Sequence, residues 1–524
     1  MKNIRWTFIV GCILSQSIFS FGQKDWSVEY AKRISESKLK EHLYILAADA
    51  MEGRETGMEG QRKAAAFLDE YYASIGIRTQ RQMFPLKKLY FTESTASIND
   101  QSFLFIKDFY FFSAKKTEDI ESKDIVFVGY GIHTDQWNDY EGIDVKNKII
   151  VCLSAEPVKD GKSVITGTEE FSDWTFDMEL KRKEAIKQGA RMFIQIDRNY
   201  DQYMSRIKYY LETPRMTLDR TGSEDEEDLT IPYIHCSERM AEVLLKNSGY
   251  KNLASVTKSA NKGKHLKSKK SRLNLKIHIH VKREDMVSDN VLAFLEGEDP
   301  ELRAEVVVIS AHYDHVGIIN GQIHNGADDD GSGTVSVMEI AKAFVEAKKE
   351  GHGPKRSILF LHVSGEEKGL LGSEWYSDHP VYPLVNTVCD LNIDMVGRKD
   401  ADHDDDRYVY LIGSDKLSTD LHKISENCNQ KYTQLKLDYT YNDPNDPNQF
   451  YYRSDHYNFA KHNIPVIFYF SGVHEDYHKP GDDPEKILYS KMTEIDQLVF
   501  HTAWDIANRA EKLKVDVIND FNNK

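Results

Sequence analysis

The chain has 524 residues, which is long enough for two or three hydrophobic cores. With 40% hydrophobic and 11% aromatic residues, it belongs to the class of folded globular proteins rather than disordered ones. The formal net charge of −16 argues against general binding to nucleic acids or to anionic membranes, because both are polyanions.

The first 22 residues have the pattern of a secretory signal peptide. Lys2 and Arg5 precede an apolar stretch, and small residues follow just before Gln23. This order predicts export to the periplasm or the cell exterior, with cleavage before Gln23. Lipoprotein processing at Cys12 would need more apolar sequence before that residue, and a signal anchor would need a longer apolar run. No later segment is apolar enough to span a bilayer, so we expect no stable membrane insertion after cleavage.

Residues 37–77 are predicted to form two helices. Leu39, Leu43 and Leu46 fall on one face of the first helix. A second apolar face with helical spacing follows and ends at Gly76, a typical stop residue.

Residues 85–265 are expected to form a separate lobe, because the sequence pattern changes there to short β-like runs and turns. The lysine-rich stretch 259–271 looks like its exit linker. The strictly alternating run 273–281 predicts a strand whose polar face carries His278 and His280. A metal pair is conceivable there, but a solvated sheet face is the expected interpretation.

After residue 285, predicted strands and helices alternate in the manner of an α/β domain. Together with the N-terminal helices, this region predicts a discontinuous catalytic domain of residues 23–84 and 266–524. Helices are expected to begin near Thr334, Ser418, Asp455 and Met492. The strand candidates are 291–296, 306–311, 358–364, 388–394, 408–413 and 464–471.

Five groups of polar side chains follow these strands, and all are of the types that bind metal ions. Because open α/β sheets place their sites at the carboxyl ends of strands, we expect the groups to converge. They are His312 and Asp314 in AHYDH, the DDD of residues 328–330 in the next loop, Glu366 and Glu367 in SGEE, Asp394, and HEDYHKPGD at 474–482.

The three consecutive aspartates need an explanation, because adjacent carboxylates repel one another unless positive charge lies nearby. A solvated turn that caps the next helix is the simple alternative. Imidazoles and carboxylates without thiolates suit zinc, with manganese or cobalt as substitutes. One ion could not use so many carboxylates and keep an open position, so we expect two ions about 4 Å apart that share a carboxylate. Glu366 and Glu367 diverge in extended backbone, so one can bind metal while the other acts as a base.

Four cysteines would remain after export, and their wide spacing matches neither a zinc motif nor a disulfide framework. Cys389 lies in an apolar strand-like run, which favours a buried, inert thiol. We expect none of Cys152, Cys236, Cys389 and Cys428 to be catalytic.

The motifs SAHYDHVG, NGADDDGSGT, SGEEKGLLGS, NIDMVGR and HEDYHKPGD span residues 310–482 in this order. The set resembles the co-catalytic zinc exopeptidases, which include bacterial leucyl aminopeptidases, glutamate carboxypeptidase II, glutaminyl cyclases and the transferrin receptor. The resemblance implies an α/β fold with a mixed sheet flanked by helices, of the phosphorylase/hydrolase-like type. The lobe at 85–265 resembles the β-rich protease-associated domain inserted in this family, through GYGI, DYEGIDVKNKIIV and EAIKQGA.

The resemblance also implies a ligand set for two zinc ions per chain. His312 and Asp394 would bind one ion, Glu367 and His478 would bind the other, and Asp329 would bridge the two.

Three further roles follow from the same resemblance. Glu366 would be the general base for a water molecule shared by the two ions, and Asp314 would orient the first histidine ligand. Tyr477 would polarise the substrate carbonyl. The peptide bond between Asp329 and Asp330 would be cis.

The leading functional hypothesis is an exported aminopeptidase that releases N-terminal residues from peptides or proteins. A carboxypeptidase or dipeptidase acting on acidic peptides is an alternative, for which Arg453 and Arg398 are candidates by their proximity to the motifs. A glutaminyl cyclase would use a single zinc ion, whereas this ligand set predicts two. A non-catalytic binding protein like the transferrin receptor should lack ligands, and here none is missing. Residue preference and oligomeric state are not predicted.

Overall fold

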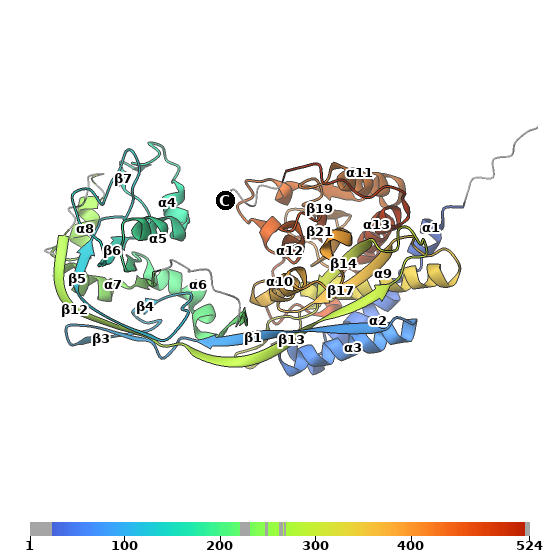
Figure 1. The fold of residues 1–524 in the computed structure, drawn as a ribbon, viewed down its shortest axis with the longest axis horizontal. Helices are drawn as coiled ribbons and strands as arrows, with labels where there is room; N and C mark the ends of the chain where they lie inside the picture. The colour runs from blue at the N-terminus through green and yellow to red at the C-terminus, as the bar shows by residue number, and fades with distance from the viewer. Residues whose placement is uncertain are drawn as a thin grey trace, which may run out of the picture. The chain divides into compact units, whose positions relative to one another are not determined.

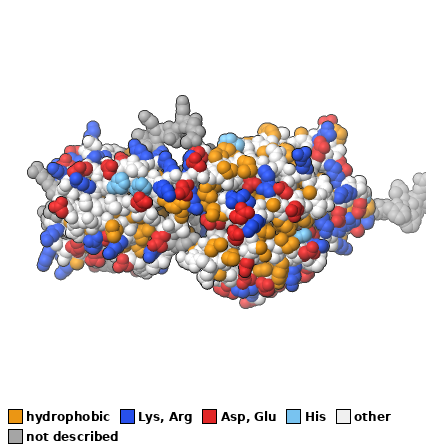
Figure 2. Space-filling view, turned by 90° about the horizontal axis from the view of Figure 1, so that it is seen from below, with side chains coloured by type: hydrophobic (Ala, Val, Ile, Leu, Met, Phe, Trp, Pro, Cys, Tyr) orange, Lys and Arg blue, Asp and Glu red, His pale blue; other side chains and the backbone are white. Residues whose placement is uncertain are grey.

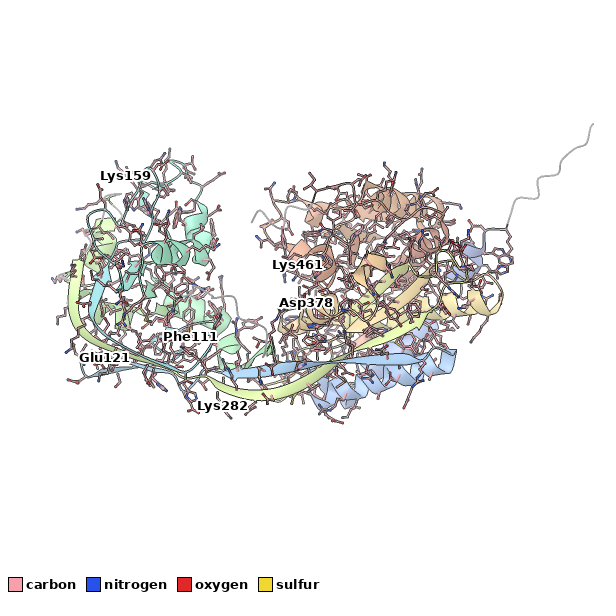
Figure 3. The ribbon with its side chains drawn as sticks, viewed as in Figure 1. Phe111, Glu121, Lys159, Lys282, Asp378 and Lys461 are labelled. Carbon is pink, nitrogen blue, oxygen red and sulfur yellow. The ribbon has the colours of Figure 1, made fainter. Side chains whose placement is uncertain are left out.

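The computed structural model describes residues 24–220, 231–246, 250–260, 262, 266 and 269–518. The predicted signal peptide, with Cys12, lies outside these residues. The chain divides into two compact units (Figure 1): Met1–Gln82 with Asn290–Lys524, and Met83–Asp289. Side chains fill each unit, with Phe111 in the core of the second, while Glu121, Lys159 and Lys282 are exposed (Figure 3).

The first unit is built on a mixed sheet, which confirms the predicted α/β class. Strands β17, β14, β18 and β21 are parallel, and β13 and β19 pair antiparallel on either side of them. From β13 the order is β13 (Lys282–Leu295), β17 (Ser357–Val363), β14 (Val306–His312), β18 (Thr387–Ile393), β21 (Val466–Phe470), β19 (Tyr408–Ile412) and β20 (Lys436–Asp438). Next to β13 lies β1 (Thr79–Tyr90), and a small hairpin is formed by β15 (Gly317–Ile319) and β16 (Gln322–His324). Residues 86–89 of β1 pair with β10 (Arg215–Leu218), and both of these segments belong to the second unit.

Helices cover both faces of this sheet, so its central strands are buried along their whole length. On β14, Val307 and Ile309 join one apolar cluster, while Val306 and Val308 join the opposite one. The first cluster includes side chains from α1 (Trp26–Ala31), α2 (Glu36–Leu46), α3 (Glu59–Ile75), α9 (Gly333–Lys349), α11 (Thr419–Cys428) and α13 (Tyr489–Asn508). The second includes α10 (Leu371–Asp378) and α12 (His456–Ala460).

The predicted strands of this unit are all present, and the predicted helix starts lie within three residues of the observed ones. The prediction missed α1 and α10, because both are short and lack a long periodic pattern.

The second unit contains an eight-stranded sheet. In order, its strands are β3 (Gln101–Leu104), β2 (Thr95–Ile98), β12 (Lys269–Ile279), β5 (Glu118–Phe127), β6 (Ile149–Leu153), β9 (Met192–Ile196), β11 (Tyr233–Cys236) and β4 (Phe109–Tyr110). The remaining elements are the β7–β8 hairpin (Val158–Lys159 and Lys162–Ser163) and helices α4 (Asp173–Phe176), α5 (Met178–Lys187), α6 (Tyr200–Glu212), α7 (Glu238–Lys246) and α8 (Leu253–Ala260).

The predicted exit from the lobe at residue 265 was wrong. Strand β12 pairs with β2 and β5 inside the second unit, so residues 266–289 belong to that unit rather than to the catalytic domain. Alternation predicted this strand correctly but could not tell which sheet it joins. His278 Nδ1 lies 2.8 Å from Asp119 Oδ1, so a hydrogen bond accounts for this half-buried histidine.

All four described cysteines are free and buried. Burial raises the pKa of Cys152 and of Cys428 to about 12, so neither is a ready nucleophile. Over the described ranges, none of the helices combines the length and apolar character required to cross a bilayer. On the face that Figure 2 shows, acidic and basic side chains are interspersed.

Candidate metal centre

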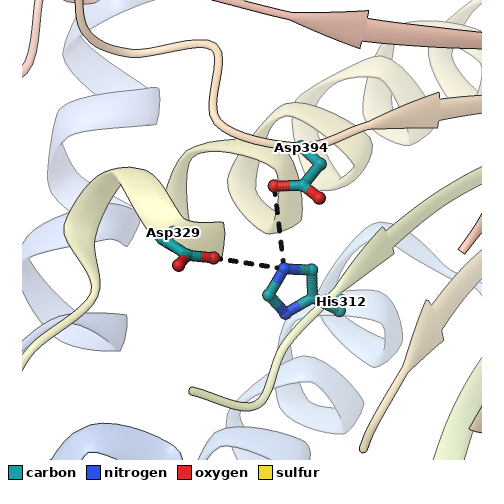
Figure 4. Close-up of side chains that lie close together, drawn as sticks. All are labelled: His312, Asp329 and Asp394. Carbon is teal, nitrogen blue, oxygen red and sulfur yellow. Dashed lines mark ion pairs between the residues drawn. The ribbon is translucent and has the colours of Figure 1, made fainter. Parts of the chain in front are cut away.

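The first group of candidate ligands lies where the parallel strands end. His312 is the last residue of β14, Asp394 follows β18, and Asp329 lies in the loop before α9. His312 Nε2 is 3.3 Å from Asp329 Oδ1 and 3.7 Å from Asp394 Oδ1 (Figure 4). The parallel pairing of β14 with β18 brings these residues, which lie far apart in sequence, to one edge of the sheet.

The second group uses the other oxygen of Asp329. His478 Nε2 lies 3.0 Å from Asp329 Oδ2 and 3.1 Å from Glu367 Oε2. His315 Nδ1 lies 2.7 Å from Glu367 Oε1 and 3.8 Å from Asp329 Oδ2. Asp329 therefore faces two separate sets of nitrogen and carboxylate ligands, one through each oxygen.

The three consecutive aspartates have three different sets of partners. Asp328 accepts a hydrogen bond from the Gly397 backbone at 2.6 Å and pairs with His474 Nε2 at 3.3 Å. Asp330 accepts from the backbone N–H groups of Gly333, Met395 and His312. Only Asp329 turns toward both ligand groups, and the peptide bond that follows it is cis.

Gly326 begins the loop that carries the three aspartates, and it has a φ of 56°. A Cβ atom there would collide with the carbonyl of Asp329 and with the ring of His315. Only glycine fits this left-handed conformation without strain at such close range.

Glu366 follows β17 in a short 3-10 turn, Glu366–Lys368, and lines a small cavity with Asp329, Asp394, Arg453 and Tyr477. The cavity has a volume of about 30 Å³, which is enough for at least one water molecule. The structure thus places the predicted base beside the predicted bridging ligand.

Asp314 is fully buried and anchors the neighbouring turns. Its carboxylate accepts from Thr56 Oγ1 at 2.6 Å and from the Glu366 backbone at 3.3 Å. His312 Nδ1 is 3.1 Å from the Asp314 carbonyl oxygen and 3.8 Å from its carboxylate. The backbone carbonyl of Asp314 is therefore closer to the imidazole of His312 than the carboxylate of Asp314 is.

The two candidate arginines differ in their surroundings. Arg398 lies 3.1 Å from Asp476 and 4.0 Å from Asp482, so acidic side chains already engage it. Arg453 is exposed, stacks on Phe450 at 4.6 Å and lines the cavity. Of the two, Arg453 is the one placed to reach a substrate.

The electrostatics of the centre favour bound positive charge. Burial opposes ionisation of Asp329, yet contacts with His312 and His478 hold its pKa well below the usual value. Burial and Asp329 would raise the pKa of Glu367, but His478 and His315 lower it to about 2. Although burial acts against it, the neighbouring carboxylates raise the pKa of His478 to about 11. Divalent cations can take the place of such protons.

The pKa values of Glu366 and Tyr477 are raised, in contrast to those of Asp329 and Glu367. Burial, joined by repulsion from Glu367 and other carboxylates, raises the pKa of Glu366 well above its usual value. Burial and the nearby acids also raise the pKa of the Tyr477 hydroxyl, which keeps that group protonated as a hydrogen-bond donor.

The ligand atoms pass a simple test of fit for divalent cations. His312 Nε2, Asp329 Oδ2 and Glu367 Oε1 are buried, and none has a hydrogen-bond partner among the described residues. Buried polar atoms are costly without a partner, and a cation would serve all three. The nitrogen and oxygen donors suit zinc, manganese or cobalt.

Sequence reasoning missed several residues of this centre. His315 stood in the AHYDH motif but received no role, although its spacing from His312 was a usable signal. Arg54 is fully buried and donates hydrogen bonds to four backbone carbonyls around the centre, and nothing in the sequence marked it. Asp482 accepts from the backbone N–H groups of Asp328 and Asp329.

Comparison with known proteins gives this centre a family. Residues 290–503, which include every candidate ligand, match the model of peptidase family M28. Over this region, the chain is similar to peptidase family M28. The predicted relationship to zinc exopeptidases is confirmed.

Two kinds of relatives accompany the M28 match. A probable leucine aminopeptidase of Arthroderma benhamiae is 29% identical over 237 residues, which cover 44% of this chain and 60% of that protein. The chain thus spans about 60% of the length of this relative. A solved aminopeptidase from Aneurinibacillus sp. strain AM-1 is 18% identical, with a TM-score of 0.57 over 94% of this chain and 98% of its own. BSAP, a zinc aminopeptidase from Bacillus subtilis, is 17% identical, with a TM-score of 0.50 over 93% of this chain and 98% of its own. These two structures show a shared fold.

Proposed function

We propose that this protein is a zinc-dependent aminopeptidase that uses two ions per chain. The observation that carries the proposal is Asp329, whose two oxygens face two separate sets of histidine and carboxylate ligands. The similarity of residues 290–503 to family M28 supports peptide hydrolysis, and the names of the relatives favour the release of N-terminal residues.

The first ion would be held by His312, Asp394 and Asp329, and the second by Asp329, Glu367 and His478. Zinc supplies Lewis acidity toward the peptide carbonyl and lowers the pKa of water to roughly 7. Mn²⁺ or Co²⁺ could substitute, because the same donors suit them.

Glu366 is the proposed general base. Its buried carboxylate lines a cavity with room for water next to Asp329. It would accept a proton from the attacking water and return that proton to the leaving amine. Burial, joined by repulsion from nearby carboxylates, raises the pKa of Glu366 and favours the proton uptake that this role requires.

Tyr477 is the proposed donor to the substrate carbonyl oxygen. It lines the same cavity as Glu366, and its ring stacks on that of His478 at 3.9 Å. A protonated hydroxyl held there can stabilise negative charge that develops on the oxygen.

We extend the proposal to the rest of the chain. Residues 1–22 would direct export and be removed, and the second unit would act as a protease-associated domain that shapes access of the substrate. Sequencing the N-terminus of the exported protein tests the first point, since an intact Met1 would contradict it.

Metal analysis joined to a substrate panel tests the central proposal. Aminoacyl reporters and carboxyl-terminal reporter peptides are assayed with and without a chelator, and zinc is counted per chain. We expect about two zinc ions and chelator-sensitive release of N-terminal residues. Glu366→Gln should lower kcat by about 10²- to 10⁴-fold with both ions retained, whereas the exposed control Glu301→Gln should not. Absence of zinc, or full activity of Glu366→Gln, would refute the proposal.

A carboxypeptidase remains the second candidate because Arg453 lines the cavity and a guanidinium can bind a terminal carboxylate through two parallel hydrogen bonds. Cleavage confined to the carboxyl-terminal reporters, and lost in Arg453→Ala, would favour this alternative.

A further inference from the structure

The second unit contains a cavity that the proposed peptidase mechanism does not use. It has a volume of about 330 Å³, and all of its lining residues belong to that unit. Ser154 and Ala155 follow β6, and Asp197 follows β9, so the cavity lies at the carboxyl ends of two parallel strands. Open α/β sheets bind their ligands at this edge, and small-molecule sites have volumes of roughly 300–1,000 Å³.

Asp197 gives the cavity a buried negative charge. Its carboxylate accepts hydrogen bonds from Tyr110 Oη at 2.7 Å, from Gln195 Nε2 at 3.0 Å and from His235 Nδ1 at 3.1 Å. Burial opposes the ionisation of Asp197, but the contact with His235, followed by the other two, holds its pKa below the usual value. The group is therefore a carboxylate at neutral pH and favours a positively charged ligand group.

His235 has one ring nitrogen without a partner. The side chain is buried and lines the cavity, and its ring stacks on Tyr110 with 4.4 Å between the centroids. Nδ1 donates to Asp197, since a carboxylate can only accept. Nε2 has no hydrogen-bond partner among the described residues. In the neutral ring this atom carries a lone pair, so a ligand that donates a hydrogen bond would satisfy it.

Two cations line the same cavity, and neither forms an ion pair with an acidic side chain of the described residues. Lys181 is buried, and its ammonium group donates to the carbonyls of Leu153 at 3.0 Å and Ala155 at 2.5 Å. Its third N–H group has no acceptor in the described part of the chain, and burial lowers its pKa. Arg198 is half-buried and donates to the carbonyl of Ser154 at 3.3 Å. A ligand carboxylate would supply the negative charge that both cations lack.

Three aromatic side chains add an apolar wall that solvent can reach. Phe176 is 71% exposed and Tyr203 is 37% exposed, while Trp174 is half-buried. Trp174 and Phe176 belong to α4, and Tyr203 belongs to α6. Aromatic side chains gathered at the surface beside a polar cavity are typical of sites that bind the apolar part of a ligand.

We propose that this cavity binds a free α-amino acid with an apolar side chain. Its ammonium group would face Asp197 and donate to Nε2 of His235, and its carboxylate would face Lys181 and Arg198. A ligand with only one of the two charges would leave part of the cavity uncompensated, so the site favours a zwitterion. The proposed aminopeptidase would release ligands of this class, but the inference depends on the second unit alone and not on that activity.

Variants of the cavity separate this site from the metal centre, which offers the same ligands a second place to bind. The full zinc-loaded chain starting at residue 24 is titrated with L-leucine and L-phenylalanine in a calorimeter. Asp197→Asn and Lys181→Met each remove one charge with little change of shape, and each should weaken binding at this site at least about tenfold. The controls Asp100→Asn and Lys107→Met remove exposed charges of the same unit and should leave binding unchanged.

A ligand series tests the assignment without any substitution of a buried group. Isocaproate has the leucine skeleton without the ammonium group, and isoamylamine has it without the carboxylate. Each should bind this site at least about tenfold more weakly than leucine, because each loses one charge-assisted contact. In Trp174→Ala, which alters only the aromatic wall, the affinity for leucine should fall while that for glycine stays the same. Equal affinity of leucine and either analogue would overturn the zwitterion assignment.

The outcomes distinguish this inference from the proposed function. If neither amino acid binds, or if binding is the same in the wild type and in the folded cavity variants, the inference is overturned. The proposed peptidase would then stand, because zinc content and the hydrolysis of aminoacyl reporters are measured independently. A chain that contains no zinc but loses leucine affinity in Asp197→Asn would support the cavity site and refute the peptidase.

Discussion

Arg54 offers the sharpest test of how the metal loops are supported. Its guanidinium is fully buried, and it donates to the carbonyls of Tyr313, Leu46, Asn325 and Gly326 at 2.7 to 2.9 Å. These carbonyls belong to the turn after β14, the end of α2 and the start of the aspartate loop. One side chain therefore ties together three segments that surround the centre.

Truncation in Arg54→Ala would leave four buried carbonyls without their donor. An unsatisfied buried polar group costs about 1–3 kcal/mol, but water can enter the space left by the side chain and satisfy part of the demand. Breaking a buried charged network typically costs about 3–5 kcal/mol. We therefore expect the free energy of unfolding of this unit to fall by about 4 kcal/mol. Arg54→Lys keeps the charge with fewer donors, so its loss should be smaller.

Urea unfolding of the metal-free chain, followed by circular dichroism, measures the effect. The matched control is Arg303→Ala, because Arg303 is an exposed arginine 3.7 Å from Glu296 and its loss should cost less than about 0.5 kcal/mol. A loss below about 1 kcal/mol in Arg54→Ala would show that the four hydrogen bonds do not support the loops as argued.

Three further predictions follow from particular contacts. Ser454 donates to Asp394 Oδ2 at 2.6 Å, so Ser454→Ala should weaken zinc binding by about 10- to 100-fold in chelator competition, and an unchanged affinity would contradict this role. The described cysteines are buried, and the pKa values of Cys152 and Cys428 are about 12. In a folded chain that starts at residue 24, a thiol reagent at pH 8 should therefore label none of the four cysteines, whereas in urea it should label all four. Burial lowers the pKa of Lys491 from 10.5 to about 8, so the unfolded state binds more protons between these values and stability should rise with pH there. Relative to Lys491→Met, the wild type should gain on the order of 2 kcal/mol between pH 8 and pH 10 in urea unfolding, and a constant difference would contradict the shift.

The strands of the first unit could be predicted because each is a short apolar run with helices on both sides in space. Apolar content and length suffice to identify such runs. The site could be predicted for a related reason, since polar residues such as Asp394 directly follow buried strands that lie parallel. The convergence of the groups then depends only on the sheet order.

What could not be predicted depends on contacts between distant segments. The alternation in β12 predicts a strand, but pairing with β2 and β5 decides its unit, and pairing partners leave no local pattern. Arg54 was missed because its acceptors are backbone carbonyls, which every residue has. The spacing of His315 from His312 could have drawn attention to it, but its partner Glu367 lies 52 positions away in the chain and no local pattern predicts that contact.

The three consecutive aspartates show how the fold reconciles a repulsive sequence with stability. Three like charges in a row would be costly if all faced one direction, but here each has its own compensation. Asp328 has a histidine and a backbone N–H, and Asp330 has backbone N–H groups alone. Asp329 instead faces a histidine through each of its two oxygens, His312 on one side and His478 on the other. A cluster that looks redundant in sequence therefore provides one proposed bridging ligand and two residues that fix the loop. Replacing Asp329 should abolish metal binding, whereas replacing Asp330 should first destabilise the loop.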